Sequence, residues 1–371
     1  MGDKSAFVRG MKLKISELGK VITGNTPSKK IKEFWDKDDV GFVKPDIISD
    51  EHIVKIKSED CNEFISNAAI SKARIVPKNS IFVTCIGNIG KIGVATENLA
   101  FNQQINAIIP NENVNLDYLC YAIFANKTRL QDIANAPIVP LLNKSQFSEF
   151  ELEFDMDINT QTRIVHELNT VSNIILKYKQ ELLLLDELVR ARFVEMFGDP
   201  IYNTQNRPMT EFINVVKMQR GYDLPVQDRN HEGSIPVYGA NGVLGYHDVA
   251  KINNGGIITG RSGTIGKVYL ANKEYWPLNT SLFSIETYGN NLIYLQYLVT
   301  LYDLKRFVEG TGVPTLNRNM FHNKKIIEVP INEQNTFASF VEEVDKSRSR
   351  IQKSLEASQE LFDCLMQEYF G

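Results

Sequence analysis

The sequence predicts an α+β protein built from two similar, mostly β domains of mixed α/β type, each followed by a long helix. Three observations predict this fold class: a set of short motifs that occurs twice in the same order, a heptad pattern after each set, and short apolar runs separated by Gly, Pro, Asn and Asp. Each copy is far larger than the repeat of a solenoid protein, so the copies are two globular units. The length of 371 residues also indicates more than one domain.

The duplication rests on three pairs of segments. They are 87–91 (GNIGK) with 263–267 (GTIGK), 139–143 (VPLLN) with 313–317 (VPTLN), and Phe197-Gly198 with Phe370-Gly371. The segments 15–24 and 212–221 form a fainter fourth pair. Two similar units predict two similar sites held at a fixed separation.

The two domains are expected at residues 1–157 and 199–330, and the second range begins with a linker rich in proline and amides, from Asp199 to Met209. Short buried strands are predicted at 81–84 and 257–259, and helices at 116–134 and 292–308. Each predicted strand leads directly into a glycine-rich turn.

Long coiled-coil helices are predicted at residues 158–198 and 331–371, each roughly 50 Å long at 1.5 Å per residue. Apolar residues recur there in alternating steps of three and four, the pattern of a coiled-coil seam. The seam positions are Ile164, Leu168, Val171, Ile175, Tyr178, Leu182, Leu185 and Val189 in the first helix, and Phe337, Val341, Val344, Ile351, Leu355, Phe362, Leu365 and Tyr369 in the second. Arg348 and Ser358 interrupt the second seam. Neither helix can bury its seam alone, so we expect them to pack on each other, on a partner protein, or on both.

Charge is unevenly distributed along the chain, although its total is only −4. Residues 1–150 hold 19 Lys and Arg against 17 Asp and Glu, and residues 201–330 hold 13 against 10, whereas the helical segments are acidic. Phosphate contact needs a local basic face rather than a basic total. The mildly basic domains fit a nucleic-acid binder, and they fit equally an ordinary surface beside Glu-rich helices.

The cysteines favour a reducing compartment. Cys61, Cys85, Cys120 and Cys364 show no CxxC pairing and no His at metal-ligand spacing, which argues against a disulfide or zinc framework. No apolar run approaches the roughly 20 residues that span a bilayer, and the N-terminus carries no apolar signal segment. We therefore expect a cytoplasmic protein without a metal site or a membrane segment.

The sequence contains no complete catalytic motif. The segment 199–202 (DPIY) approaches the Asn/Asp-Pro-Pro-aromatic motif of adenine methyltransferases, but Ile201 breaks it and no glycine-rich cofactor turn precedes it. Pro45-Asp46 is not followed by the Asp/Glu-x-Lys of metal-dependent nucleases, and the glycine turns are too short for nucleotide-binding loops. A catalytic role is not expected.

Glycine turns and amide-rich stretches are the candidates for contact with DNA. Two glycines allow another polymer to approach closely, and the lysine after them can meet a phosphate, although a tight turn at a sheet corner needs the same glycines. Asn and Gln can bond bidentately to adenine, and Arg or Lys to guanine, although Asn and Ser equally often cap loops. The candidate residues are Thr84, Asn88, Lys91, Asn102, Gln103, Gln104, Asn143, Lys144 and Gln146 in the first copy, and Thr259, Arg261, Ser262, Thr264, Lys267, Asn279, Thr280, Asn317, Arg318 and Asn319 in the second.

Taken together, these features resemble the specificity subunit of type I restriction-modification systems. The resemblance is carried by both glycine turns, both Val-Pro-x-Leu-Asn segments, the helix entry Gln161-Thr162-Arg163-Ile164 and the segment 187–200 (ELVRARFVEMFGDP). It covers essentially the whole chain, and the duplicated order is its most specific part.

The resemblance implies two target recognition domains that each read one half of a split DNA target in the major groove, with two different half-sites. It also implies that the long helices pair antiparallel in a pseudo-twofold arrangement and hold the half-sites about 34 Å, one turn of DNA, apart. Two methyltransferase subunits would dock on the helices, and restriction subunits would join that core. Catalysis, S-adenosylmethionine, ATP and magnesium would belong to those partners, and this chain would hold no cofactor. A coiled-coil scaffold for proteins and a stand-alone modification enzyme are the competing interpretations.

Overall fold

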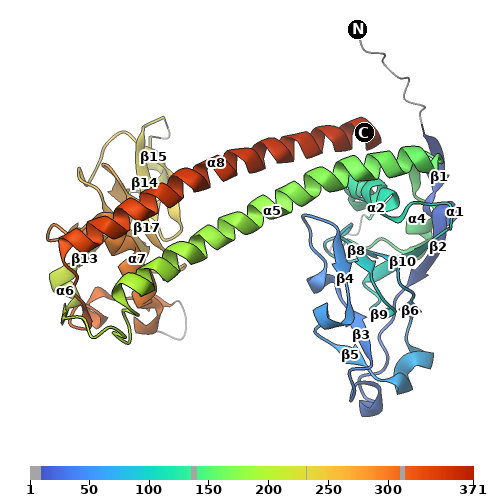
Figure 1. The fold of residues 1–371 in the computed structure, drawn as a ribbon, viewed down its shortest axis with the longest axis horizontal. Coiled ribbons are helices and arrows are strands. Elements are labelled where there is room, and N and C mark those ends of the chain that lie inside the picture. Colours follow the sequence, from blue (N-terminus) through green and yellow to red (C-terminus); the bar gives the residue numbers. More distant parts are fainter. Residues whose placement is uncertain (1–9, 135–139, 231, 310–313) are drawn as a thin grey trace, which may run out of the picture. The chain divides into compact units, whose positions relative to one another are not determined.

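The computed structural model describes residues 10–134, 140–230, 232–309 and 314–371. The chain divides into two compact units, residues 1–176 with 355–371 and residues 177–354. Each unit holds one mostly β domain and a part of both long helices (Figure 1). The predicted fold class, α+β with two similar domains and two long helices, is confirmed.

The first domain is formed mainly by strands. They are β1 (Met11–Lys14), β2 (Gly19–Thr23), β3 (Val40–Val43), β4 (Val54–Ile56), β5 (Phe64–Ile65), β6 (Ile75–Val76), β7 (Ile81–Thr84), β8 (Ile92–Ala95), β9 (Leu99–Phe101), β10 (Ile105–Pro110) and β11 (Glu151–Phe154). One sheet has the order β2-β10-β7-β8-β4 and a second has the order β5-β3-β9-β6, while β1 pairs with β11. The predicted strand at 81–84 is β7, at the centre of the first sheet and fully buried.

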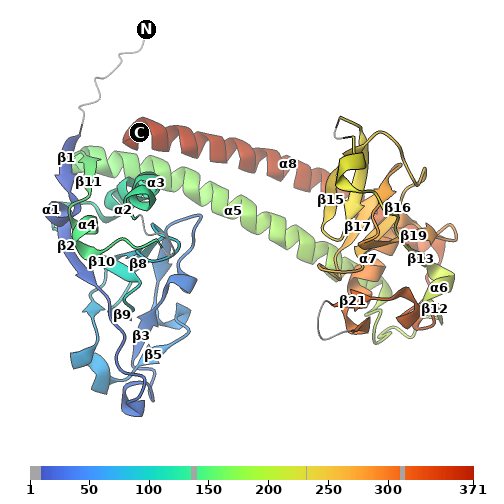
Figure 2. The same cartoon turned by 180° about the vertical axis from the view of Figure 1, so that it is seen from behind.

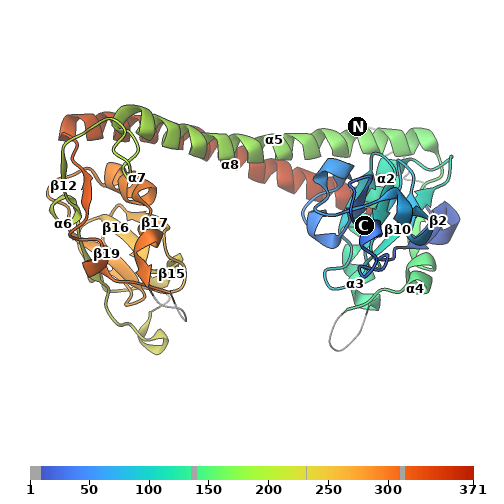
Figure 3. The ribbon, with the colours of Figure 1, turned by 90° about the horizontal axis from the view of Figure 1, so that it is seen from below.

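The second domain repeats the main part of this topology. Its strands are β12 (Met209–Glu211), β13 (Lys217–Arg220), β14 (Ile235–Gly239), β15 (Gly242–His247), β16 (Gly256–Gly260), β17 (Val268–Ala271), β18 (Trp276–Pro277), β19 (Ser281–Glu286), β20 (Val308–Glu309), β21 (Thr315–Leu316) and β22 (Lys325–Ile327). The sheet β13-β19-β16-β17 has the order of β2-β10-β7-β8, and Figure 3 labels its strands β16, β17 and β19. The parallel pair β14–β18 corresponds to the parallel pair β3–β9. The repeat found in the sequence is therefore a repeat of the fold.

Short helices complete the domains, and two of them end earlier than predicted. The α-helices are α1 (Ile15–Leu18), α2 (Leu116–Ala125), α3 (Lys127–Ile133), α4 (Lys144–Ser148), α6 (Phe212–Val215) and α7 (Leu292–Tyr302). The 3₁₀-helices are η1 (Lys32–Phe34), η2 (Pro45–Ile47), η3 (Ser58–Asp60), η4 (Asn67–Lys72), η5 (Val226–Asp228), η6 (Leu304–Phe307) and η7 (Arg318–Met320). The helix predicted over 116–134 divides at Asn126, whose side chain donates back to Ala122 O (2.9 Å). The helix predicted over 292–308 stops at Asp303, because the left-handed φ of this residue, +51°, cannot continue an α-helix.

The long helices α5 (Ile158–Phe197) and α8 (Ile331–Phe370) begin and end within one residue of the predicted positions. In the first unit, the end of α8 packs beside the start of α5 and against α2, where Ile164, Leu168 and Met366 share one core (Figures 1 and 2). In the second unit, the end of α5 packs with the start of α8, where Phe193 and Phe337 meet edge to face at 5.4 Å. The two helices are thus antiparallel within each unit.

Polar residues in the seam of α8 have partners. The Arg348 guanidinium lies 2.7 Å from a carboxylate oxygen of Asp186 on α5, so an ion pair between the helices replaces an apolar contact at this position. The Tyr369 hydroxyl donates to Glu167 on α5. Nearer the middle of α5 the seam is less enclosed, because Tyr178, Leu182 and Leu185 are only half-buried.

A buried glutamine ties each long helix to its own domain. Gln161 on α5 accepts from Asn115 N (2.8 Å) and donates to Asp155 O (2.6 Å). Gln334 on α8, 173 residues later, accepts from Asn291 N (2.9 Å) and donates to Val329 O (2.8 Å). Asn115 and Asn291 are the N-caps of α2 and α7, so each glutamine anchors the same short helix in its own copy.

Candidate nucleic-acid interface

Each glycine turn joins two neighbouring strands of the main sheet, β7 to β8 and β16 to β17. All its glycines lie in the left-handed region that favours glycine, with φ of +75° at Gly87, +88° at Gly90, +80° at Gly263 and +96° at Gly266. A Cβ added at Gly90 would meet the side chain of Lys127, and one added at Gly266 would meet that of Lys305. The two turns therefore match in backbone and in the lysine that covers the second glycine, a feature that the sequence did not indicate.

The strand ends before the turns differ between the copies. Thr84 is buried and holds its turn closed, because its hydroxyl donates to Asn88 O (2.6 Å) and accepts from Lys91 N (3.0 Å). The residue at the same place in the second copy is Gly260, where an added Cβ would lie 1.8 Å from Thr264 O.

Thr259 lies one position earlier and is fully buried in β16. Thr84 and Thr259, both predicted to contact DNA, are therefore turn and core residues whose side chains DNA cannot reach.

The repeated Val-Pro-x-Leu-Asn segments lie against the turns. Gly87 N donates to Pro140 O (3.0 Å), and Leu316 N donates to Arg261 O (2.8 Å) in the second copy. Val139 and Val313, the first residues of the two segments, are outside the described residues. The two motifs that repeat along the chain thus lie side by side in each domain.

The asparagines that end these segments are helix caps. Asn143 accepts from Gln146 N (2.9 Å), and the Gln146 side chain accepts from Asn143 N (3.1 Å), which forms a reciprocal capping box at α4. Asn317 accepts from Asn319 N (3.1 Å) at η7. For Asn143, Gln146 and Asn317, capping is the role that the structure shows. Lys144 and Asn319 are exposed beside these caps, and Arg318 is half-buried.

Among the amides that follow β9, Gln103 is the exposed one. Asn102 is 6% exposed and bonds to Gln104 through both its oxygen and its nitrogen. Gln103 accepts from the hydroxyl of Thr26 (2.7 Å). At the same place in the second copy, Asn279 donates to a carboxylate oxygen of Asp223, and Thr280 beside it is exposed.

The cationic side chains around the second turn have fewer protein partners than those around the first. Lys91 is half-buried with its ammonium 3.4 Å from Pro45 O, and Lys127 is paired with Asp50. Hydrogen bonds from Lys127 and Asn88 hold the pKa of Asp50 below its usual range. Arg261, Lys267 and Lys305 surround the second turn with Ser262 and Thr264. Across the described part of the chain none of these three cations forms an ion pair.

Arg261 occupies the position of Cys85 in the first copy. Burial raises the pKa of the Cys85 thiol to about 12, so this cysteine stays protonated at neutral pH.

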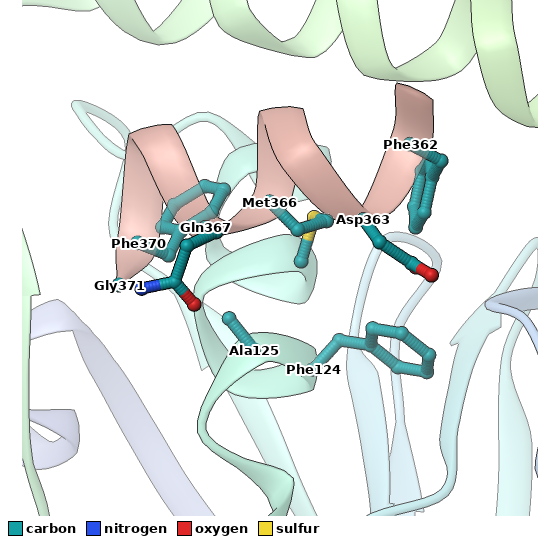
Figure 4. Close-up of a pocket in the computed structure, with 8 residues that line it drawn as sticks. All are labelled: Phe124, Ala125, Phe362, Asp363, Met366, Gln367, Phe370 and Gly371. Atoms are coloured by element: carbon teal, nitrogen blue, oxygen red, sulfur yellow. The ribbon is translucent and has the colours of Figure 1, made fainter. Parts of the chain in front are cut away.

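The described ranges hold no group of three or more His, Cys, Asp or Glu arranged for a metal ion. None of their helices has the length and apolar composition that crossing a membrane requires. A hollow lies between the end of α2 and the last turns of α8 (Figure 4), lined by Phe124, Ala125, Phe362, Asp363, Met366, Gln367, Phe370 and Gly371. It includes none of the residues predicted to contact DNA.

A family described as the type I restriction modification DNA specificity domain matches this chain twice, at residues 10–184 and 203–359. The chain belongs to this family. The two matches of the specificity domain coincide with the two copies of the fold described above.

Curated relatives in the family are named as specificity subunits. The MjaIX specificity subunit of Methanocaldococcus jannaschii is 30% identical over 191 residues, 50% of this chain and 43% of that relative. The HindI specificity subunit of Haemophilus influenzae is 35% identical over 149 residues, 39% of this chain and 32% of that relative. The match therefore spans less than half the length of these two relatives. The EcoprrI specificity subunit of Escherichia coli is 20% identical over 360 residues, 90% of this chain and 87% of that relative.

Two solved structures share the fold over nearly the full chain. A crystal structure of the S subunit of a type I restriction-modification system from M. genitalium matches with a TM-score of 0.64 and 15% identity, over 100% of this chain and 98% of that one. A structure described in connection with the assembly of the type I system matches with a TM-score of 0.55 and 11% identity, over 97% of both chains. At these identities the likeness concerns the fold.

Proposed function

We propose that this chain is the sequence-reading subunit of a type I restriction-modification complex. Each domain reads one half of a split DNA target, and the two half-sites differ. The chain positions methyltransferase and restriction subunits on that target and catalyses neither methylation nor cleavage itself.

One observation carries this proposal: the two domains share a backbone but present different side chains at equivalent places. Around the matched glycine turns, Arg261 replaces Cys85 and Thr264 replaces Asn88. A shared backbone would dock both domains on DNA in the same way through phosphate contacts, while the side chains that differ would select different bases. An asymmetric bipartite target follows.

Partners supply the rest of the activity in this proposal. Two methyltransferase subunits dock on α5 and α8, and restriction subunits join them. S-adenosylmethionine, ATP and magnesium are used by those partners and not by this chain. The complex works on DNA in the cytoplasm, where the four free cysteines stay reduced.

Sequencing of methylated bases tests the proposal directly. Cells that express this chain with its candidate methyltransferase should carry a split asymmetric methylation motif, and deleting this chain should abolish it. Methylation that persists unchanged after the deletion would contradict the proposal and favour a coiled-coil scaffold for proteins. Binding of S-adenosylmethionine by the purified chain alone would instead favour a stand-alone modification enzyme.

Two rearrangements separate the roles of domains and helices. Replacing residues 1–157 by the equivalent domain of a relative should change one half-site and leave the other as it was. Inserting one heptad, about 10 Å of helix, into both α5 and α8 should change the preferred spacer and neither half-site. A change of both half-sites in the first experiment, or an unaltered spacer in the second, would refute the corresponding role.

A further inference from the structure

Two loops touch at the same place in both domains. The first loop follows β2 (residues 24–27) or β13 (221–224), and the second follows β9 (102–104) or β18 (278–280). Their backbones are bonded in matching fashion in the two copies. Gly24 N donates to Ile105 O (3.1 Å) as Gly221 N donates to Ser281 O (3.1 Å), and Asn25 N donates to Phe101 O (3.0 Å) as Tyr222 N donates to Pro277 O (2.8 Å).

Glycine is required at the contact in both copies. A Cβ added at Gly24 would lie 2.1 Å from Asn102 O, and one added at Gly221 would lie 2.2 Å from Leu278 O. A backbone carbonyl cannot yield at that distance without moving its loop. The approach of the two loops is therefore built into the fold and fixes the positions of the side chains that follow.

Side chains two residues after each glycine bridge the loops. The Thr26 hydroxyl donates to Gln103 Oε1 (2.7 Å), and Asn279 Nδ2 donates to Asp223 Oδ1. We call these the cross-loop pairs. Thr26, Gln103 and Asp223 are exposed and Asn279 is partly so, so the pairs add little to either core. The place is repeated, but the chemistry is Thr–Gln in one copy and Asp–Asn in the other.

The cross-loop pairs lie directly beside the glycine turns. Cys85 N, at the start of the first turn, donates to Gln104 O (2.8 Å), one residue after Gln103. Arg261 N donates to Thr280 O (2.9 Å), one residue after Asn279. Each pair thus shares one surface with the turn and with the cations that could hold phosphates.

We propose that the cross-loop pairs are specificity determinants: Thr26–Gln103 reads one base pair of the first half-site and Asp223–Asn279 reads one base pair of the second. This inference rests on the proposed function. It adds Thr26 and Asp223, which no sequence pattern marked, and it assigns the reading to side chains that are already held in place.

The hydrogen bond within each pair orients its amide. In the first domain the Thr26 hydroxyl occupies one lone pair of Gln103 Oε1, which leaves the Nε2 hydrogens and the other lone pair of this exposed side chain available for other partners. That is the donor and acceptor set that bonds N7 and N6 of adenine. In the second domain Asn279 keeps one N–H and its oxygen, and the Asp223 carboxylate adds an acceptor suited to the N4 amine of cytosine.

An amide held in place loses less conformational freedom on binding than a free one. The pairs should therefore contribute to selectivity between bases rather than to the strength of binding to all DNA.

Exchange of the pairs tests the assignment. Thr26→Asp with Gln103→Asn gives the first domain the pair of the second, and methylated-base sequencing reads the result in cells that also express the methyltransferase subunits. We expect the preferred base to change at one position of the first half-site, with a discrimination of about 5- to 150-fold, the range of one bidentate base contact. The second half-site should stay the same. Gln103→Ala should weaken the discrimination between bases at that position, and Asn279→Ala should do so at one position of the second half-site.

A matched control is available in the same chain. Asn214 Nδ2 in α6 donates to the hydroxyl of Thr210 in β12 (3.2 Å), an Asn–Thr pair that does not adjoin a glycine turn. Asn214→Ala should leave both half-sites unchanged. Thermal unfolding midpoints of all variants should agree closely, because exposed pairs contribute little to stability.

The possible failures are distinct. A methylation motif that depends on this chain but is unaffected by the exchange and by both alanine variants would overturn this inference alone. The pairs would then only join the two loops. Methylation that does not depend on the chain would overturn the proposed function as well. If the exchange lowers the unfolding midpoint, the conservative variant Thr26→Val is the test. Weaker discrimination between bases at the position that Gln103→Ala affects would support the inference, and unchanged discrimination there would refute it.

Discussion

Replacing the buried glutamines by leucine should loosen each domain from its long helix separately. Gln334→Leu leaves three groups without their partner: Asn291 N, Val329 O and the side-chain oxygen of Asn290, which lies 2.7 Å from Gln334 Nε2. Gln161→Leu leaves two, Asn115 N and Asp155 O. Both glutamines are almost fully buried, at 1% and 0% exposure, so water cannot replace the lost bonds easily.

The expected losses follow from these numbers of partners. A buried polar group left unsatisfied costs about 1–3 kcal/mol, part of which leucine burial offsets. We expect a loss of about 2–4 kcal/mol for Gln161→Leu and about 3–5 kcal/mol for Gln334→Leu in the unit that carries the change. Because about 1.4 kcal/mol is a factor of ten, even a loss of about 2 kcal/mol speeds amide exchange roughly 30-fold.

Hydrogen exchange followed by mass spectrometry measures both units in one sample. Gln161→Leu should speed exchange in α2 and leave α7 as it was, and Gln334→Leu should do the reverse. The copy that is not mutated is the matched control. Equal acceleration in both units, or less than threefold acceleration in the mutated one, would refute the view that these glutamines anchor the domains individually.

Three further predictions concern the second domain. Lys267→Ala should reduce the slope of log affinity for DNA against log salt by about 0.9. Lys91→Ala should reduce the slope less, because the Lys91 ammonium already lies 3.4 Å from Pro45 O. Equal slopes for the two variants in a salt titration would contradict this difference. Gly260→Ala should lower the thermal unfolding midpoint more than Gly263→Ala, because the new Cβ meets Thr264 O at 1.8 Å in the first case and open space in the second; the reverse ranking would show that the left-handed φ of Gly263 matters more than the clash. Burial, with the nearby charges of Arg318 and Lys217, lowers the pKa of His322 to about 4, so the unfolded chain binds the proton more readily and stability should fall as pH drops from about 6.5 to 4. Unfolding midpoints of His322→Gln should fall less across that window, and identical pH profiles would contradict the assignment.

Periodicity and repetition predicted much of the fold. The bounds predicted for α5 and α8 agree with the structure to within one residue. An apolar seam that repeats over many helical turns still indicates a helix where single polar residues interrupt it. The order of the duplicated motifs predicted that the topology would repeat. The break at Asp303 was missed, because a left-handed φ at a residue other than glycine depends on its local contacts and leaves no periodic trace.

The burial of individual candidate residues could not be predicted from the sequence. Thr259 was predicted to contact DNA, but the position equivalent to Thr84 is Gly260, and Thr259 is fully buried in the core. Thr26 and Asp223, which we propose as base-reading residues, could not be identified from the sequence because their hydrogen-bond partners lie 77 and 56 residues away along the chain. A sequence motif identifies residues that are close along the chain, whereas a contact surface for DNA combines residues that are close in space.

At Gly24 and Gly221 the loop backbone is fixed by close contact, whereas the side chains beside it differ between the two copies. The loops are held by backbone bonds and by the missing Cβ in both copies, so their approach does not depend on which exposed side chains form the cross-loop pair. Under the proposed reading by the cross-loop pairs, two substitutions would change the preferred base while the loop backbone stays as it is. The two copies in this chain carry two different pairs, Thr–Gln and Asp–Asn, on the same loop arrangement.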